Sequence, residues 1–189
     1  DVTAECSVTS LAAPTATDNC GGVVTVTNDA SLPITAQGTT VVTWTYTDAS
    51  GNSTTQTQNV VIDDVTPPTF ASVPTDVTVE CAAAVPAMVD LTWNDNCDVT
   101  GTVTGSDVNN GGDPVTITRT WTYTDGGGNT VTATQTITID DTTAPTPDAA
   151  SLADVTAECS VTSLTAPTAT DNCGGVVTVT SDATLPINT

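Results

Sequence analysis

An internal repeat is the feature that most constrains what this chain can fold into. Residues 1–34 recur as residues 154–187, and only three of the 34 positions differ. A more divergent copy lies between them, because "VTVEC" at 77–81 matches "VTAEC" at 2–6 and "TWTYTD" at 120–125 matches residues 43–48. A unit of about 75 residues that recurs along a chain predicts a tandem array of one module.

The repeat predicts three modules, at residues 1–66, 67–143 and 144–189. The third stops before its own copy of "TWTYTD", so it holds only the first half of a unit. Half of a β-sandwich leaves a sheet face open and is not expected to be stable alone. We therefore expect the sequence to be an excerpt of a longer array.

Each unit alternates between apolar and polar residues with a period of two. Val42, Trp44 and Tyr46 share one face of an expected strand, and threonines occupy the other. The turns "DASGN" at 48–52 and "DGGGN" at 125–129 are typical of β-hairpins. The pattern predicts an all-β fold of tandem immunoglobulin-like antiparallel β-sandwich modules, without helices. In the first copy we expect strands near residues 2–8, 13–18, 23–27, 31–36, 39–47 and 54–62.

The charge balance excludes several classes of function. The chain has 22 acidic residues, one basic residue (Arg119) and no histidine, for a formal charge of −21. Nucleic acids and anionic membrane surfaces recruit Lys and Arg, so neither is an expected partner. The chain has no apolar run of about 18 residues, and we expect no membrane insertion in this segment. Because histidine and lysine are missing, we do not expect an enzyme.

Six cysteines fall two to a repeat, as Cys6 and Cys20, Cys81 and Cys97, and Cys159 and Cys173. Zinc sites are built from closely spaced cysteines or from histidines, which the chain lacks. A turn midway between Cys6 and Cys20 would place them opposite one another on adjacent strands. Counting alone does not settle connectivity, but the modular repeat favours pairing within each module. Such a loop would contribute about 3 kcal/mol in the chain-entropy model, and disulfides indicate an oxidising, extracellular setting.

The acidic residues occupy fixed positions in the repeat. All three glutamates precede the first cysteine of a unit, and aspartates recur before Asn-Cys, at the hairpin turn and at the end of a unit. On an immunoglobulin-like sandwich these loops should converge where two modules meet, so we expect Glu80, Asp95 and Asp125 of the second repeat to lie near Asp63 and Asp64. Converging carboxylates repel one another unless a cation neutralises them, and Ca²⁺ accepts six to eight oxygen ligands with less strict geometry than Mg²⁺.

We therefore predict Ca²⁺ sites between modules. The candidate ligands at junctions inside the chain are Asp63, Asp64, Glu80, Asp95, Asn96, Asp125, Asn129, Asp140, Asp141, Glu158, Asp171 and Asn172. A further set, completed by a preceding module, comprises Glu5, Asp18, Asp48 and Asn52. The alternative stays open that each acidic residue only forms a turn, because Asp, Asn and Gly are common turn residues.

The single arginine has two alternative explanations. The second repeat has Arg119 where the first has Val42, and Trp93 where the first has Ala16. Arg119 has the same strand parity as Trp121. A cation–π contact between Arg119 and one of these tryptophans would explain both changes. A pair between Arg119 and an aspartate at a sheet edge would explain the arginine equally well.

The motifs "VTAEC", "TDNC" and the "TDxxGN" hairpin resemble the hyalin-repeat (HYR) module, an immunoglobulin-like extracellular domain. The likeness covers both full copies and the partial one, and is greatest to the tandem HYR modules in large surface adhesins of gliding Bacteroidetes. It implies a role in adhesion or in a cell-surface filament, and it implies no catalytic residues.

Together these observations predict an extracellular stalk or filament, on the cell surface or secreted, whose modules carry disulfides and whose junctions are stiffened by Ca²⁺. Its expected partners are neighbouring repeats of the same chain, further copies in a fibre, and an unknown surface or glycan ligand. Two alternatives remain: a carbohydrate- or protein-binding module, and a fibre subunit that assembles by strand exchange. Sugar sites usually expose aromatic residues, and only Trp93 is expected to face outward.

Overall fold

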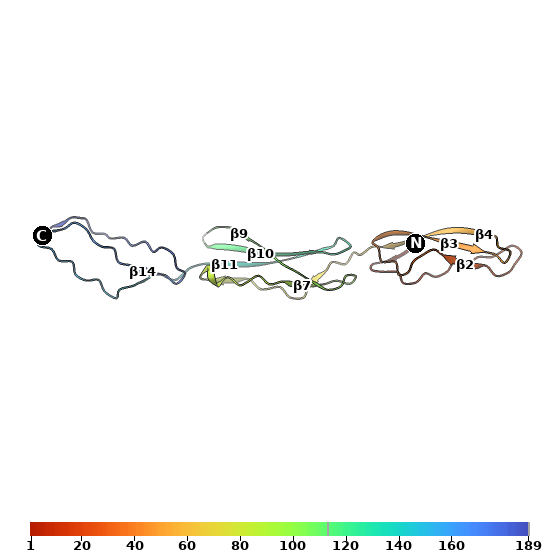
Figure 1. Ribbon diagram of the computed structural model, residues 1–189, viewed down its shortest axis with the longest axis horizontal. Coiled ribbons are helices and arrows are strands. Elements are labelled where there is room, and N and C mark those ends of the chain that lie inside the picture. Colours follow the sequence, from red (N-terminus) through yellow and green to blue (C-terminus); the bar gives the residue numbers. More distant parts are fainter. Residues whose placement is uncertain (113, 189) are drawn as a thin grey trace. The chain divides into compact units, whose positions relative to one another are not determined.

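The computed structural model describes residues 1–112 and 114–188. Asp113 and Thr189, which fall within the predicted second and third modules, lie outside the described residues. The described chain is built from β-strands, and its one helical element is a three-residue 3₁₀ turn, Ala82–Ala84. The predicted all-β class is therefore confirmed (Figure 1).

The first repeat forms a four-stranded sheet in the order β1-β4-β3-β2. Its centre is the hairpin of β3 and β4, which pair antiparallel from Gly38 opposite Ile62 to Thr47 opposite Ser53. The predicted turn "DASGN" closes this hairpin, and Gly51 there has a φ of 88°, a conformation that glycine adopts without steric cost. The strands are β1 (Val2–Ala4), β2 (Thr25–Asn28), β3 (Gly38–Thr47) and β4 (Ser53–Ile62).

Strand β1 pairs parallel, not antiparallel, with the end of β4. Val2 lies opposite Val60 and Ala4 opposite Ile62. The amide N–H of Asp63 then donates to the carbonyl of Ala4 at 3.0 Å. The chain therefore leaves β1 at the same end of the module where it leaves β4, and this places Glu5 and Cys6 beside the exit of the repeat.

Two strands expected in the first repeat do not form. Residues 13–18 and 31–36 contain no strand, and only a single bridge joins Val8 to Ile34. Pro14 and Pro33 lie in these segments, and a proline has no backbone N–H to give to a strand ladder. The prediction was wrong there because it weighed alternation above the proline positions.

The second repeat has two sheets. One contains four strands in the order β6-β11-β10-β9, and the other three in the order β5-β7-β8. As in the first repeat, the first strand of the larger sheet pairs parallel with the end of the last, Val77 with Ile137 and Val79 with Ile139. The strands are β5 (Thr69–Phe70), β6 (Val77–Val79), β7 (Leu91–Asn94), β8 (Gly101–Val103), β9 (Ser106–Asn109), β10 (Val115–Thr124) and β11 (Thr130–Ile139).

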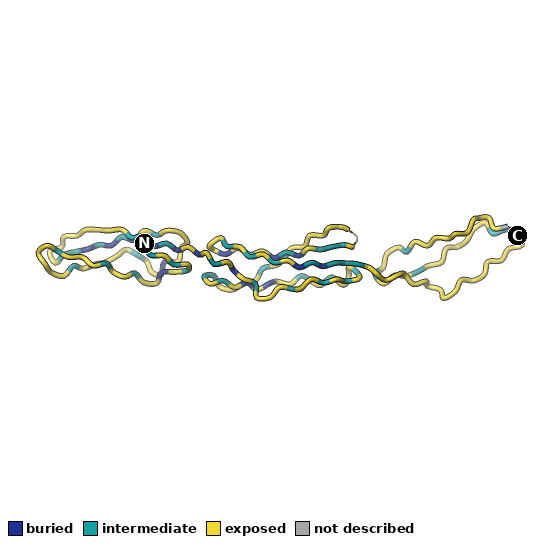
Figure 2. Tube along the Cα trace, turned by 180° about the vertical axis from the view of Figure 1, so that it is seen from behind, coloured by how far each residue is buried: buried dark blue, intermediate teal, exposed yellow. Residues whose placement is uncertain are grey.

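The third repeat contains two short antiparallel pairs. Val161 lies opposite Ile187 and reproduces the bridge between Val8 and Ile34 in the first repeat. Most of this segment is exposed, in contrast to the buried stretches of the two longer hairpins (Figure 2). The pairs join β12 (Thr146–Pro147) to β14 (Ala169–Thr170) and β13 (Ser160–Val161) to β15 (Ile187–Asn188).

The buried side chains follow the predicted strand parity. Val42, Trp44 and Tyr46 are all buried, whereas Val41, one position out of phase, is 58% exposed. In the second repeat Trp93 is buried too, and its ring stacks on Tyr123 with centroids 3.8 Å apart. The expectation that Trp93 faces outward was therefore wrong.

Residue contacts divide the chain into two compact units that cut across the repeats. The first unit contains Asp1–Pro74, Met88–Ser106 and Thr120–Thr134. The second contains Thr75–Ala87, Asp107–Arg119 and Gln135–Thr189. The first compact unit thus contains the whole first repeat and part of the second, so the contacts between these two repeats lie within one unit.

Candidate inter-module junctions and cation site

Two disulfides join neighbouring repeats. Cys6 is bonded to Cys97 with the α-carbons 4.8 Å apart, and Cys81 is bonded to Cys173 with the α-carbons 5.0 Å apart. Each bond links the first cysteine of one repeat to the second cysteine of the next. The predicted pairing within modules is therefore wrong, because the parallel β1 and β6 carry Cys6 and Cys81 toward the following repeat. Cys20 and Cys159 have no disulfide partner in the described chain.

The residues around each disulfide define two junctions. The first junction comprises Glu5, Cys6, Asp64 and Thr66 of the first repeat with Asp95, Asn96, Cys97, Asp125, Gly127 and Asn129 of the second. All ten belong to the first compact unit. The second junction comprises Glu80, Cys81, Asp141, Thr142 and Thr143 with Asp171, Asn172 and Cys173, all in the second unit.

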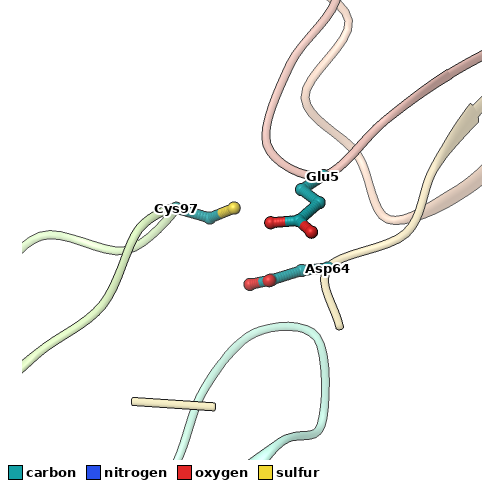
Figure 3. A group of neighbouring side chains, drawn as sticks. All are labelled: Glu5, Asp64 and Cys97. Carbon is teal, nitrogen blue, oxygen red and sulfur yellow. The ribbon is translucent and has the colours of Figure 1, made fainter. Parts of the chain in front are cut away.

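Glu5 connects the two sides of the first junction. Its Oε2 accepts hydrogen bonds from Thr66 Oγ1 at 3.0 Å and from Asn96 Nδ2 at 2.6 Å. Figure 3 shows its carboxylate beside that of Asp64, with the Cys97 sulfur directed toward them. Glu5 was predicted to face a preceding module, and the parallel pairing of β1 places it at this exit junction instead.

Three aspartates converge at the first junction. Asp64 follows β4, Asp95 follows β7 and Asp125 opens the hairpin between β10 and β11. One carboxylate oxygen from each lies within 4.8 Å of those of the other two. Asp64 is 4% exposed and Asp125 8% exposed. The predicted loops therefore do meet, and they bring together three carboxyl groups, of which those of Asp64 and Asp125 are buried and that of Asp95 is half-buried.

These aspartates hold their turns with one oxygen and leave another free. Asp95 Oδ1 accepts from the amides of Cys97 at 2.9 Å and Asp98 at 3.0 Å. Asp125 Oδ1 accepts from the Asn129 amide at 2.7 Å. The Oδ2 atoms of Asp95 and Asp125 are buried, and no donor among the described residues reaches them. Since buried polar atoms are normally hydrogen-bonded, these two oxygens call for a partner.

The electrostatics of the cluster are unequal. Burial raises the pKa of Asp64, and the charges of Asp95, Asp125 and Glu5 raise it further, against one opposing hydrogen bond from the Thr66 amide. Burial also acts to raise the pKa of Asp95, but the backbone amides that bind its carboxylate outweigh burial and lower the pKa overall. Asp64 is thus the residue whose negative charge most needs compensation.

The second repeat also contacts the first through its hairpin. Asn129 Nδ2 donates to the backbone oxygen of Asp64 at 2.8 Å. The backbone of Gly127 comes so close that a Cβ there would lie 2.7 Å from the same oxygen. Thr66 and Gly127 were not among the predicted junction residues. The recurrence of Thr66 as Thr143 was an available signal for the first, but nothing in the repeat pointed to Gly127.

The second junction repeats part of this arrangement. Glu80 Oε2 accepts from the Thr142 amide at 3.0 Å and Thr143 Oγ1 at 3.3 Å, and these bonds, the Thr142 amide foremost, lower its pKa. Glu80 was predicted to lie near Asp63 and Asp64, so its position at the opposite end of its repeat is a correction. Ligand atoms of Asp141 and Asp171 lie within 4.8 Å of one another, but Asp141 is exposed, and no third aspartate joins them among the described residues.

The other predicted ligands do not belong to the two groups of converging aspartates, Asp64 with Asp95 and Asp125, and Asp141 with Asp171. Asp18, Asp48 and Asn52 bond within their own turns, and the amides of Asp63 and Asp140 bond to the first strand of their repeat. Asn172 Nδ2 lies 3.7 Å from the Cys81 sulfur, as Asn96 does from Cys6. Glu158 is exposed.

Arg119 pairs with an aspartate, as the second of its two alternatives required. Its Nε donates to Asp107 Oδ1 at 2.8 Å and its Nη2 to Oδ2 at 3.0 Å. Its Nη1 donates to the carbonyls of Pro86 and Ala87. The guanidinium is almost fully buried and is part of the architecture of the second compact unit.

Small β-modules that carry disulfides are typical of extracellular proteins, in which disulfides form and persist. The chain belongs to the family of the HYR-like domain with 4 cysteines, whose model matches residues 1–62 and 69–139. Each matched stretch contains two cysteines, and each contributes to a bond with a neighbour. No protein with a curated functional description matches the chain.

The family and the two disulfides indicate an extracellular domain. An adhesion-type module of this all-β architecture is typically not an enzyme. None of the helical structure in residues 1–112 and 114–188 has the length and apolar character needed to cross a bilayer.

Proposed function

We propose that this chain is a segment of an extracellular adhesive or structural array, a stalk or filament on the cell surface. In it, each pair of neighbouring HYR-like modules is held by a disulfide and by a Ca²⁺ ion. At the first junction the ion would bind to Asp64, Asp95 and Asp125. The observation that carries the proposal is the pair of buried, unpartnered Oδ2 atoms of Asp95 and Asp125 beside the buried Asp64.

The ligand chemistry favours Ca²⁺ over other cations. The donors are carboxylate oxygens, and the backbone oxygen of Asp64 lies in the same turn. Hard oxygen donors suit Ca²⁺ and Mg²⁺, and Mg²⁺ demands near-ideal octahedral geometry and keeps several waters. Three aspartates from three different loops form an irregular set, which the flexible coordination of Ca²⁺ accommodates better.

The proposed role of the ion is to stiffen the junction. Asp64 belongs to the first repeat, whereas Asp95 and Asp125 belong to the second. An ion bound by all three has its full affinity only when the repeats adopt the arrangement that brings these side chains together. Binding therefore shifts the population toward that arrangement. A stiff junction suits a module whose task is to hold an adhesive surface away from a cell.

Calorimetric titration of the 189-residue chain with CaCl₂ tests the proposal. We expect binding with a Kd on the order of 10⁻⁴ to 10⁻³ M, the range of extracellular Ca²⁺ modules, and much weaker binding of MgCl₂. Asp125→Asn should abolish most of this binding. Asp48→Asn, at the equivalent hairpin position of the first repeat, is the matched control and should leave it intact. Absence of Ca²⁺ binding, or equal loss in both variants, would overturn the proposal.

A further inference from the structure

The two unbonded cysteines have a systematic position in the repeat. Cys20 is the second cysteine of its repeat, as are Cys97 and Cys173, which are both bonded to the repeat before them. Cys159 is the first cysteine of its repeat, as are Cys6 and Cys81, which are both bonded to the repeat after them. Cys20 and Cys159 are both exposed. They are therefore the two complementary halves of one further junction.

The first repeat already presents the surface that such a junction needs. Asp18 Oδ1 accepts from the Cys20 amide at 2.8 Å, and Asp95 and Asp171 hold Cys97 and Cys173 in the same way at 2.9 Å. Asp48 Oδ1 accepts from the Asn52 amide at 2.8 Å, as Asp125 does from Asn129 at 2.7 Å. The two turns with which the second repeat contacts its neighbour therefore have the same hydrogen bonds in the first repeat.

One side chain differs between the bonded and the unbonded surface. In the first junction Asn129 Nδ2 donates across to the backbone oxygen of Asp64. In the first repeat the equivalent Asn52 Nδ2 folds back and donates to Asp48 Oδ2 at 2.8 Å. The two equivalent asparagines therefore differ in their partners: Asn129 bonds to the neighbouring repeat, and Asn52 bonds to its own turn. Asn52 thus carries the donor group that, at the equivalent position of the second repeat, bonds to a neighbouring repeat.

Building on the proposed array of disulfide-joined modules, we propose that Asp18, Asn19, Cys20, Asp48 and Asn52 form a docking surface for the Glu-Cys segment of another HYR-like module, which a disulfide from Cys20 then closes. The matching segment on this chain is Glu158–Cys159, since Cys6 and Cys81 are already bonded. Asn19 would donate to the glutamate, as Asn96 does to Glu5. The disulfides then run from module to module as a continuous series.

The bond forms by thiol–disulfide exchange with a small-molecule or protein disulfide. The thiolate of Cys20 attacks one sulfur of the oxidant disulfide, which forms a mixed disulfide with Cys20 and releases the other sulfur as a thiol. The thiolate of Cys159 on the second molecule then attacks the Cys20 sulfur and releases the other thiol. Two cysteine thiols are oxidised to one disulfide, and one oxidant disulfide is reduced to two thiols.

The test mixes two variants of the 189-residue chain, Cys20→Ser and Cys159→Ser, in a glutathione redox buffer. Each variant has one open cysteine, so random pairing would make half of the disulfide-linked dimers mixed. We expect almost all dimers to be mixed, with the bond between Cys20 of one variant and Cys159 of the other. A mixed fraction of half, or a majority of Cys20–Cys20 dimers, would overturn the proposal.

Bond identity is read by Asp-specific proteolysis without reduction, since a single arginine gives trypsin one site. The Cys20 and Cys173 peptides differ at Asn28 and Ser181, and the Cys6 and Cys159 peptides at Ala12 and Thr165, so mass distinguishes all four. Asn19→Ala in the Cys159→Ser chain should lower the mixed fraction toward half, and an unchanged fraction would overturn recognition by this surface. The mixed fraction is measured both with EDTA and with CaCl₂. This comparison shows whether pairing depends on Ca²⁺, so that a failure of this proposal can be told from a failure of the proposed Ca²⁺ site.

Discussion

Cys6 and Cys97 are 91 positions apart in the sequence, yet their α-carbons lie 4.8 Å from each other. Cys20, only 14 positions from Cys6, is not its partner. In the chain-entropy model, a bond that closes so long a loop stabilises the folded state by about 1.7 kcal/mol more than a bond within one module would.

Replacing both Cys6 and Cys97 with serine should therefore lower the free energy of unfolding by about 4–5 kcal/mol, the chain-entropy value for a loop of this length. Urea unfolding followed by tryptophan fluorescence measures the change. The matched control replaces the exposed Cys20 and Cys159 and should shift the free energy by less than about 0.5 kcal/mol in the monomer. Equal stability of the two double variants would contradict the connectivity.

Gly127→Ala should weaken the first junction, because its Cβ would meet the Asp64 backbone oxygen at 2.7 Å. Overpacking of this kind costs about 1–3 kcal/mol. The neighbouring Gly126→Ala is the control, since its nearest contact would be Asp98 Oδ1 at an ordinary 3.6 Å. Hydrogen exchange of the amides that flank Asp64 should rise in the first variant alone. The same rise in both would show that the hairpin itself, and not its contact with the first repeat, is responsible.

The ion pair between Arg119 and Asp107 predicts a pH dependence. The hydrogen bonds from Arg119 lower the pKa of Asp107 below its ordinary value, so the pair's stabilisation is present above that ordinary value and is lost as the pH falls through the lowered one. Asp107→Asn should cost about 1–3 kcal/mol at pH 7, toward the lower end because the Asp107 side chain is 37% exposed. Urea unfolding at a series of pH values should show the two proteins converging below about pH 4. A difference that stays constant would refute this assignment.

Trp93→Ala should destabilise the second repeat by about 3–5 kcal/mol, because it removes a buried ring that stacks on Tyr123. The near-ultraviolet circular dichroism of the stacked pair should fall with it. Val99→Ala, on a side chain that is 85% exposed, serves as the control and should change neither quantity measurably. A stable Trp93 variant with an unaltered spectrum would place this ring on the surface after all.

Local pattern was sufficient to predict much of the fold. The alternation around Trp44 and Tyr46 identified the buried face of β3, and the hairpin turns lie where "DASGN" and "DGGGN" predicted them. The meeting of Asp64, Asp95 and Asp125 followed from sandwich topology, since the loops that carry them emerge at the ends where modules join. Each of these inferences depends on residues near one another or on a common architecture.

Connectivity between repeats could not be predicted in the same way. In a tandem array each Glu-Cys has two equivalent partners by symmetry, one in its own repeat and one in the next. The choice depends on whether the first strand pairs at the start or the end of the last strand. Val2 opposite Val60 decides this, and nothing in the alternation of residues 2–8 indicates it. The same unknown moved Glu5 and Glu80 from the predicted end of their repeats to the other.

The order of the disulfides also decides what happens when the chain is pulled. Tension that reaches the second repeat through Cys97 passes back along the sixteen-residue step to Cys81 and leaves through Cys173. Once this route is taut, the remaining residues of the repeat carry little of the load. A repeat of about 75 residues would otherwise stretch to about 250 Å, but this shorter covalent route allows only about 55 Å. Such a chain behaves under force as a nearly inextensible tether.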